Sequence, residues 1–304
     1  MRQYGIGYQG SKSQIAEKII TALPSGKRLV DLFGGGFAIS HCALLSRKWD
    51  KVLYNDIDPL LAPLIQDAIA GKYNYHRFIP EWVSREEFHK RKNTDGYVKI
   101  AWSFGCRGKD YIYSAEIEEY KRYGHEWIIH NTPIPGFENI HCGLPCTPEY
   151  FAKRREYLNK TSKRYKGERF ELQNLEWLER LQNLEQLERL QNLEYSSMDY
   201  RDYVYQDGDV VYCDIPYQNC GDSKNDDYTG DFNHGEFYQW AVSMPFPVYF
   251  SSYKLGGVVM ECDKRITLSA TDNSSIRREV LYCVDNNFVP PKKYMQGYLF
   301  KEMI

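Results

Sequence analysis

The chain has 304 residues, of which 42% are hydrophobic, and its formal net charge is −2. This length allows one large domain or two modest ones, and the balanced charge requires any nucleic-acid contact to come from a local basic surface. No apolar run approaches the roughly 20 residues of a membrane span, and Met1-Arg2-Gln3-Tyr4-Gly5 lacks the apolar core of a signal peptide. We therefore expect a cytosolic protein with no membrane partner.

A helix is predicted near the amino terminus. Glycines and tyrosines fill Gly5–Gly10, and the next segment places Ile15, Ala16, Ile19, Ile20 and Leu23 at helical spacing up to Pro24-Ser25-Gly26. Ser11-Lys12-Ser13 stands where a helix cap is expected. A glycine-flanked helix start with a lysine also favours a bound anion. The pattern fits an ordinary cap as well.

The next unit is a short strand, residues 27–31, followed by Leu32-Phe33-Gly34-Gly35-Gly36-Phe37 and a helix from Ala38 to Ser46. Consecutive glycines between a strand and a helix permit a tight turn and let a ligand approach the backbone, while Asp31 supplies an acceptor. The spacing matches neither the dinucleotide nor the phosphate-loop pattern, which disfavours a pyrophosphate ligand.

A second strand, residues 51–55, ends in Asp56-Ile57-Asp58-Pro59. An acid at the end of the second strand is placed to bind ribose hydroxyl groups. Asp58, which precedes a proline, is typical of a helix cap, so Asp56 is the candidate ribose ligand. A helix is expected from Leu60 to Ala70.

Regular strand–helix alternation stops after Gly71, and basic residues are interleaved with aromatic ones up to about Lys166. Such a run is often only a solvated face, but a local basic excess is also what DNA phosphates require. Ser103–Tyr111 has the composition of a hairpin that reads bases, with Arg107 and Lys109 at its tip. Lys153, Arg154 and Arg155 are further candidates for phosphate contacts.

Residues 172–194 repeat a nine-residue unit, Leu-Gln-Asn-Leu-Glu-x-Leu-Glu-Arg. Leucines that recur every three residues drift around a helix of 3.6 residues per turn, which argues against a coiled-coil seam. We expect a helix packed between two surfaces, with Leu193-Glu194-Tyr195 already in a strand and a structural role for the repeat.

After Asp209, the four uncharged, β-prone residues Val210–Cys213 predict a strand buried on both faces, which leads directly into Asp214-Ile215-Pro216-Tyr217. Ligands of an open α/β sheet bind beyond the carboxyl ends of its strands. The Asp214 carboxylate and the Ile215 carbonyl beside the Tyr217 ring suit a planar base that carries an amino group. The alternative is an ordinary strand that ends in a proline turn. A helix at Phe237–Ser243, a strand at Val248–Ser252 and short strands towards Ile304 follow.

The eight cysteines are scattered, and we interpret them as free thiols in a reducing compartment. The alternative is a zinc site, for which Cys142 and Cys146 with His141 and His130 supply four potential ligands. The spacing has no second Cys pair, so we expect no metal.

Taken together, the glycine loop, Asn55-Asp56-Ile57 and Asp214-Ile215-Pro216-Tyr217 resemble the motifs of the Dam-like, alpha-group DNA adenine methyltransferases. Tyr8-Gln9-Gly10-Ser11-Lys12 is similar to the amino-terminal cofactor motif of that family. Ser197-Met198-Asp199-Tyr200 is similar to the acidic segment before the catalytic strand. The chain departs from the commonest Asp-Pro-Pro-Tyr at Ile215, which contributes a backbone carbonyl.

The resemblance implies an α/β, Rossmann-like methyltransferase fold, with a central, mostly parallel sheet and helices on both faces. Residues 1–71 and 191–304 would form the S-adenosylmethionine-binding catalytic domain, and residues 72–190 an inserted, largely helical domain that recognises double-stranded DNA. The family's catalytic motif falls on Asp214, Ile215, Pro216 and Tyr217. Its cofactor-binding residues fall on Tyr8, Gly10, Lys12, Asp31, Phe33, Gly34, Gly36, Asp56, Ile57, Asp199 and Tyr200.

The implied reaction moves the methyl group of S-adenosylmethionine to the 6-amino group of a flipped adenine, leaves S-adenosylhomocysteine and requires no metal. The resemblance also implies a bacterial or phage-encoded protein, and we expect a monomer. Attack on carbon 5 of cytosine is disfavoured, because Pro145-Cys146 and Glu138-Asn139-Ile140 occur in the wrong order. Methylation of the 4-amino group of cytosine and an inactive DNA-binding module remain as alternatives.

Overall fold

The computed structural model describes residues 3–164, 170–187, 192–217, 232–253, 266–267 and 279–284. Contacts divide the chain into two compact units. The first has the bounds Met1–Tyr4, Lys12–Ile57 and Asn192–Ile304, and the second has the bounds Gly5–Ser11 and Asp58–Gln191. The expected division at residues 71 and 191 differs from these bounds at Gly5–Ser11 and at the helix that follows Asp58.

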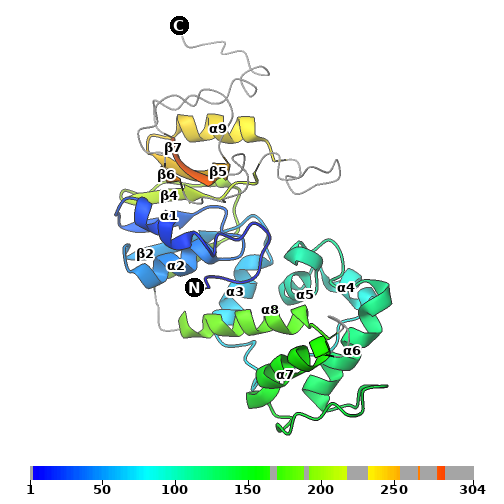
Figure 1. The fold of residues 1–304 in the computed structure, drawn as a ribbon. Coiled ribbons are helices and arrows are strands. Elements are labelled where there is room, and N and C mark those ends of the chain that lie inside the picture. The colour runs from blue at the N-terminus through cyan, green and yellow to red at the C-terminus, as the bar shows by residue number, and fades with distance from the viewer. Residues whose placement is uncertain are drawn as a thin grey trace. The chain divides into compact units, whose positions relative to one another are not determined.

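The first unit is built on one sheet with the strand order β3-β2-β1-β4-β5-β7-β6 (Figure 1). The pairs from β3 to β5 are parallel, whereas β7 is antiparallel to both β5 and β6. The expected mostly parallel α/β sheet is therefore confirmed. The strands are β1 (Arg28–Asp31), β2 (Lys51–Asn55), β3 (Leu193–Ser196), β4 (Asp209–Cys213), β5 (Val248–Tyr253), β6 (Ile266–Thr267) and β7 (Glu279–Val284).

Helices cover both faces of this sheet. Successive side chains of a strand point to opposite faces. Val30 and Val211 share a buried cluster with Phe237 of α9 (His234–Ser243), whereas Tyr54 packs against Phe37 at the start of α2 (Ala38–Ser46). Contacts of α1 (Ala16–Ala22) with α2 complete the second layer. The central strands are therefore buried on both sides, which explains why their interior positions are uncharged.

The start of α1 differs from expectation. The helix begins at Ala16 with Ile15 as its N-cap residue and has no side-chain cap. Ser13 instead accepts a hydrogen bond from the backbone N–H of Tyr4, at 2.8 Å. The prediction that Ser11-Lys12-Ser13 caps the helix is therefore wrong, and Lys12 lies ahead of the helix rather than in its first turn.

In the described part of the second unit, the regular elements are helices, and the strand-like pairing is an isolated antiparallel bridge between Ser103 and Tyr111. That bridge closes the predicted hairpin, whose tip is a 3₁₀ turn at Phe104–Cys106 rather than a pair of strands. The helices are α3 (Leu61–Ile69), α4 (Arg85–Arg91), α5 (Gly96–Ala101), α6 (Ala115–His130), α7 (Phe151–Arg164) and α8 (Gln173–Gln182).

The leucine repeat forms α8 and the 3₁₀ helix η3 (Asn183–Leu187), and then leads to β3. The leucines at 172, 175, 178, 181, 184 and 187 are all at most 1% exposed. α8 packs against both α3 and α5, so a stripe that drifts around the helix still finds partners, and η3 packs on α3. Three residues per turn in η3 keep Leu184 and Leu187 on one face. The prediction of a helix packed between two surfaces is confirmed for residues 173–187, and Leu193-Glu194-Tyr195 lies in β3 as expected, whereas residues 188–191 lie outside the described part of the chain.

The amino-terminal segment of the second unit approaches α8 closely. A Cβ atom on Gly7 would lie 1.4 Å from Cζ3 of Trp177, so only glycine fits there. Within the described residues, no helix is both long and apolar enough to cross a membrane. The strands expected between residue 285 and Ile304, and the thiols of Cys220 and Cys262, lie outside the described residues.

Candidate active site

The parallel register brings the candidate residues to one edge of the sheet. Asp31 is paired with Tyr54 on one side and with Tyr212 on the other. Because β1, β2 and β4 run in the same direction, the residues that follow these three positions emerge together at the carboxyl edge. Asp56 and Asp214 therefore follow the two strands that flank β1, and they lie at the same edge as Asp31.

The carboxylate of Asp214 is held by two donors. Nζ of Lys12 lies 3.0 Å from its Oδ1, and Oγ of Ser251 donates to the same oxygen at 3.1 Å. Burial raises the pKa of Asp214, while the charge of Lys12 and the two hydrogen bonds act in the opposite direction. The side chain of Asp214 is 19% exposed and that of Lys12 is 6% exposed, so this ion pair is largely withdrawn from water.

The rest of the tetrapeptide is fixed by packing and by one hydrogen bond. Ile215 is buried, and the Pro216 carbonyl lies 2.7 Å from Nε2 of His234 at the start of α9. Nζ of Lys12 lies over the ring of Tyr217, 4.4 Å from its centroid. Burial raises the pKa of Tyr217 far above its ordinary range, so this phenol stays neutral. One cation thus contacts both Asp214 and Tyr217.

The glycine loop is tied to the end of β2. Gly34 N–H donates to the Asn55 carbonyl at 2.7 Å, and Gly35 N–H donates to Oδ2 of Asp56 at 2.8 Å. The Tyr54 hydroxyl donates to the Gly35 carbonyl at 2.8 Å. A Cβ atom on Gly34 would lie 2.3 Å from Cε2 of Tyr54, which explains why glycine is needed there. Gly36, the residue that follows Gly35 in the loop, is buried.

Asp31 lies beneath this loop and is 1% exposed. Its Oδ2 accepts hydrogen bonds from the backbone N–H and the hydroxyl of Ser40, at 3.2 and 2.7 Å. Its Oδ1 is buried and has no hydrogen-bond partner in the described part of the chain. Burial raises the pKa of Asp31 to about 7, although the Ser40 hydroxyl opposes the shift. A buried acceptor of this kind favours a positively charged donor.

Four candidate cofactor residues of the first unit remain to be placed, and they are Phe33, Ile57, Asp199 and Tyr200. The Ile57 side chain is 68% exposed beside Asp56. The ring of Phe33 packs against that of Tyr200, with 5.3 Å between the centroids. The Asp199 carboxylate is engaged by Arg201, whose Nε and Nη2 donate to it at 2.8 and 2.7 Å.

Two predicted cofactor residues, Tyr8 and Gly10, belong to the second unit. The Tyr8 carbonyl accepts a hydrogen bond from Ser11 N–H at 3.1 Å, and Gly10 has a φ of +75°. The structure therefore brings Lys12, Asp31, the glycine loop, Asp56 and Asp214 into one unit, and Tyr8 and Gly10 into the other.

The sequence reasoning missed three residues of the site. Ser251 of β5 contacts Asp214 directly, and Glu279 of β7 interacts electrostatically with Lys12 and Asp214, with its own pKa raised by burial. Asn55 joins two segments of the site, because its Nδ2 donates to the carbonyls of Leu32 and Met198 at 2.9 and 3.0 Å. The sequence could have indicated Asn55, because it ends a predicted strand directly before Asp56. Ser251 and Glu279 depend on long-range strand pairing, which has no local signal.

Comparison with protein families settles the class of reaction to which this geometry belongs. The model of the family described as D12 class N6 adenine-specific DNA methyltransferase matches residues 8–239. The chain belongs to this family. No curated protein matches the chain. The family acts on the 6-amino group of adenine in DNA, which decides against cytosine as the target, and it implies S-adenosylmethionine as the methyl donor.

The five candidate phosphate-binding residues of this methyltransferase differ in their surroundings. Arg107, Lys109 and Lys153 are exposed. Arg155 forms a bidentate pair with Glu179, at 2.9 Å from Nε to Oε1 and 2.6 Å from Nη2 to Oε2. Its guanidinium is thus already engaged by a carboxylate.

The surroundings of Arg154 contradict the predicted phosphate contact. It is 2% exposed, and its guanidinium donates to the carbonyls of Trp127, Ile128 and Leu144 and to the Asn131 side chain. Trp127 and Ile128 lie in the last turn of α6, where a cation also interacts favourably with the helix dipole. Arg154 is therefore a buried C-terminal cap and is not available to a phosphate. Its charge in the sequence gave no indication of this.

Cys146 of the alternative zinc site contacts the same helix end, and Cys142 contacts the Leu144 carbonyl that Arg154 also engages. The Cys146 thiol donates to the carbonyls of Ile128 and Ile129, at 3.5 and 3.2 Å. The Cys142 thiol donates to the Leu144 carbonyl at 3.9 Å. Among the described residues, no three or more His, Cys, Asp or Glu side chains come together in a way that would hold a metal ion.

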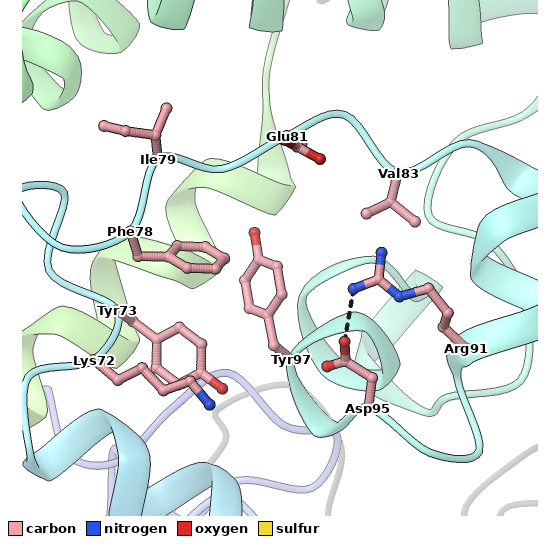
Figure 2. Close-up of a pocket in the computed structure, with 9 residues that line it drawn as sticks. All are labelled: Lys72, Tyr73, Phe78, Ile79, Glu81, Val83, Arg91, Asp95 and Tyr97. Atoms are coloured by element: carbon pink, nitrogen blue, oxygen red, sulfur yellow. Dashed lines mark hydrogen bonds and ion pairs between the residues drawn. The ribbon is translucent and has the colours of Figure 1, made fainter.

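The second unit also contains a pocket of about 300 Å³, which is lined by the segment between α3 and α4, by Arg91 of α4, and by Asp95 and Tyr97 at the start of α5. Figure 2 shows the rings of Tyr73, Phe78 and Tyr97 along one side of it. Arg91 pairs with Asp95 at 2.8 Å on the other side. The stacked rings of Tyr73 and Tyr97, with 5.5 Å between centroids, make this wall part of the unit's core.

Proposed function

We propose that this chain is a site-specific enzyme that transfers the methyl group of S-adenosylmethionine to the 6-amino group of an adenine flipped out of double-stranded DNA. The family match supplies the class of reaction. The observation that carries the proposal is the Asp214 carboxylate, which is held at the carboxyl edge of the sheet by Lys12 and Ser251 and is followed by Pro216 and Tyr217. We expect the enzyme to act as a monomer.

Asp214 and the Ile215 carbonyl accept hydrogen bonds from the two N–H groups of the adenine amine. These bonds direct the nitrogen lone pair towards the methyl group, and Tyr217 stacks on the extruded ring. The cofactor, when bound, supplies an electrophilic methyl group, and its sulfur keeps the electron pair of the broken bond. The nitrogen then loses one proton, which reaches solvent by way of Asp214. Catalysis therefore depends on orientation and fixed dipoles rather than on a covalent enzyme intermediate.

We assign the cofactor to the edge formed by β1, β2 and the glycine loop. The partnerless Oδ1 of Asp31 fits the ammonium group of the cofactor's methionine moiety. The Asp56 carboxylate, which accepts a hydrogen bond from Gly35 N–H, fits a ribose hydroxyl, and the exposed Ile57 offers an apolar surface to the adenine ring. Phe33 and Tyr200 flank the loop, while Asp199 acts through Arg201. Gly34 and Gly36 allow close approach, and Tyr8 and Gly10 complete the set by family resemblance.

We assign DNA recognition to the second unit. Arg107 and Lys109 occupy the tip of a loop that carries glycines at 105 and 108 with positive φ, and Phe104 beside them is 63% exposed. Exposed cations on such a loop suit phosphates and base edges. Lys153 adds an exposed cation at the start of α7. The family match does not specify the DNA sequence that is recognised.

The deciding experiment is to incubate the purified chain with labelled S-adenosylmethionine and mixed-sequence duplex DNA, digest the DNA to nucleosides and identify the methylated base. We expect label only on the 6-amino group of adenine. Label on the 4-amino group of cytosine would move the target to cytosine, and no label on DNA would overturn the proposal.

The role of Asp214 is tested in the same assay. We expect Asp214→Ala to abolish transfer while the affinity for S-adenosylmethionine stays close to that of the parent chain. Asp50→Ala, which removes an exposed carboxylate from the same unit, is the matched control and should transfer normally. Normal turnover by Asp214→Ala would refute the assignment of the catalytic residue.

A further inference from the structure

The two oxygens of the Asp214 carboxylate have different surroundings. Lys12 and Ser251 both contact Oδ1, at 3.0 and 3.1 Å. In the described part of the chain, every hydrogen bond and ion pair of this carboxylate goes to Oδ1. Because the side chain is still 19% exposed, Oδ2 is the oxygen left to accept a hydrogen bond from a substrate amine. The orientation of the carboxylate thus decides whether an acceptor faces the substrate.

Ser251 reaches Asp214 because of the strand register. Tyr212 is paired with Tyr249 and Cys213 with Phe250 on β4 and β5. One step further along both strands brings Asp214 opposite Ser251, and side chains at directly opposed positions share a face of the sheet. Ser251 is 0% exposed, so its hydroxyl needs partners inside the protein.

A second hydroxyl fixes the direction of the hydrogen bonds. The Tyr212 hydroxyl lies 2.7 Å from Oγ of Ser251, and its ring is 0% exposed. An ionised carboxylate only accepts, so the single proton of Ser251 points to Asp214. The Tyr212 hydroxyl then donates to Oγ of Ser251. The result is a one-way chain from Tyr212 to Ser251 to Asp214, in which each bond strengthens the next.

We infer that Ser251 is a positioning residue for methyl transfer, which pins Oδ1 of Asp214 so that Oδ2 faces the adenine amine. The inference rests on the proposed role of Asp214. Lys12 alone would leave the carboxylate free to rotate about the ion pair, because a single ammonium contact on one oxygen does not define its plane. The hydroxyl approaches from β5 and supplies the second fixed direction.

A serine with only a structural role would respond differently to substitution. If Ser251 only satisfied buried groups, its loss would lower stability and leave the pH dependence of turnover unchanged. A positioning donor also stabilises the ionised form of Asp214, because the hydrogen bond from Ser251 lowers the pKa that burial raises. The other charged or titratable groups that face Asp214, namely Lys12, Asp31 and Glu279, stay unchanged when Ser251 is replaced. Removal of the hydroxyl should then shift the acid limb of the turnover profile to higher pH, since a protonated carboxyl group no longer offers the same acceptor.

The experiment compares Ser251→Ala with Ser252→Ala in the full chain. Ser252 makes an ideal match because it is the next residue of β5, is also buried and points to the opposite face of the sheet. We expect Ser251→Ala to lower kcat about tenfold or more, the loss typical of a hydrogen bond to a charged group. Its acid limb should rise by about half a pH unit or more. Affinity for S-adenosylmethionine should stay unchanged, and Ser252→Ala should keep both kcat and the acid limb.

Tyr212→Phe tests the direction of the hydrogen bonds from Tyr212 to Ser251 to Asp214, and it remains informative if Ser251→Ala does not fold. It keeps the ring and removes only the donor to Ser251, so we expect a smaller loss of kcat and a smaller shift of the acid limb in the same direction. An unchanged kcat and acid limb in Ser251→Ala would overturn the inference. Equal losses in Ser251→Ala and Ser252→Ala with no shift of the acid limb would also overturn it.

Failure of this inference is distinct from failure of the proposed function. If Asp214→Ala is inactive while Ser251→Ala behaves as the parent chain, only the role of Ser251 is wrong. If Asp214→Ala turns over normally, the catalytic role of Asp214 is wrong and the inference falls with it.

Discussion

Arg154→Ala should destabilise the second unit rather than weaken DNA binding. The guanidinium donates to the Ile128 and Leu144 carbonyls, both at 3.1 Å, and lies 4.2 Å from the Trp127 ring centroid. Its removal takes charge-assisted hydrogen bonds away from the Trp127, Ile128 and Leu144 carbonyls, at about 1 kcal/mol or more each, and loses about 1 kcal/mol of cation–π contact. We expect the free energy of unfolding to fall by about 3–5 kcal/mol.

The measurement is urea unfolding followed by tryptophan fluorescence, combined with DNA binding under conditions where the variant is folded. Lys153→Ala is the matched control, because this neighbour in α7 is exposed. It should leave stability within about 0.5 kcal/mol of the parent chain and weaken binding to any duplex. Unchanged stability with weakened DNA binding in Arg154→Ala would refute the buried-cap interpretation and return this residue to the phosphate-binding surface.

Three further predictions concern the proposed DNA-binding loop and the proposed cofactor site. Replacing both Arg107 and Lys109 by Glu should weaken duplex binding and reduce its salt dependence without changing cofactor affinity; equal losses of both would mean that the loop supports the fold. Cofactor affinity, measured by calorimetry, should fall as the pH drops from 8 to 6, because Asp31, with its pKa near 7, becomes protonated and loses its attraction for an ammonium group. Asp31→Asn should bind weakly with no such dependence, and a flat parent profile would contradict the assignment. Gly34→Ala should lower cofactor affinity because its Cβ would lie 2.3 Å from Cε2 of Tyr54, and normal affinity would show that the loop adjusts.

The strands were predictable because their sequences reflect burial directly. Asp209–Cys213 and residues 51–55 are short, uncharged in their interiors and β-prone, and the structure places β4 and β2 at these residues. Parallel register then explains why acids that end different strands meet at one edge. The family motifs lie at those same strand ends. Local sequence therefore contained most of the information about the first unit.

Charge, by contrast, was a poor guide to the second unit. Lys153, Arg154 and Arg155 are consecutive, yet in the fold the first is exposed, the second is buried against the end of α6 and the third is paired with Glu179. Consecutive residues of a helix point in directions about 100° apart, so a run of three cations cannot all face one ligand. Which of them faces solvent depends on packing partners that are distant in the sequence.

Ser251 illustrates the limit of local sequence within the site itself. Phe250-Ser251-Ser252 reads as a neutral part of a strand, and neither serine differs from the other in composition or spacing. The register of β5 against β4 makes one serine a neighbour of Asp214, and a shift of one residue would exchange the two. The groups that orient a catalytic carboxylate thus come from strand pairing, whereas the carboxylate itself comes from a motif. For this reason the comparison of Ser251 with Ser252 tests the register and the mechanism at the same time.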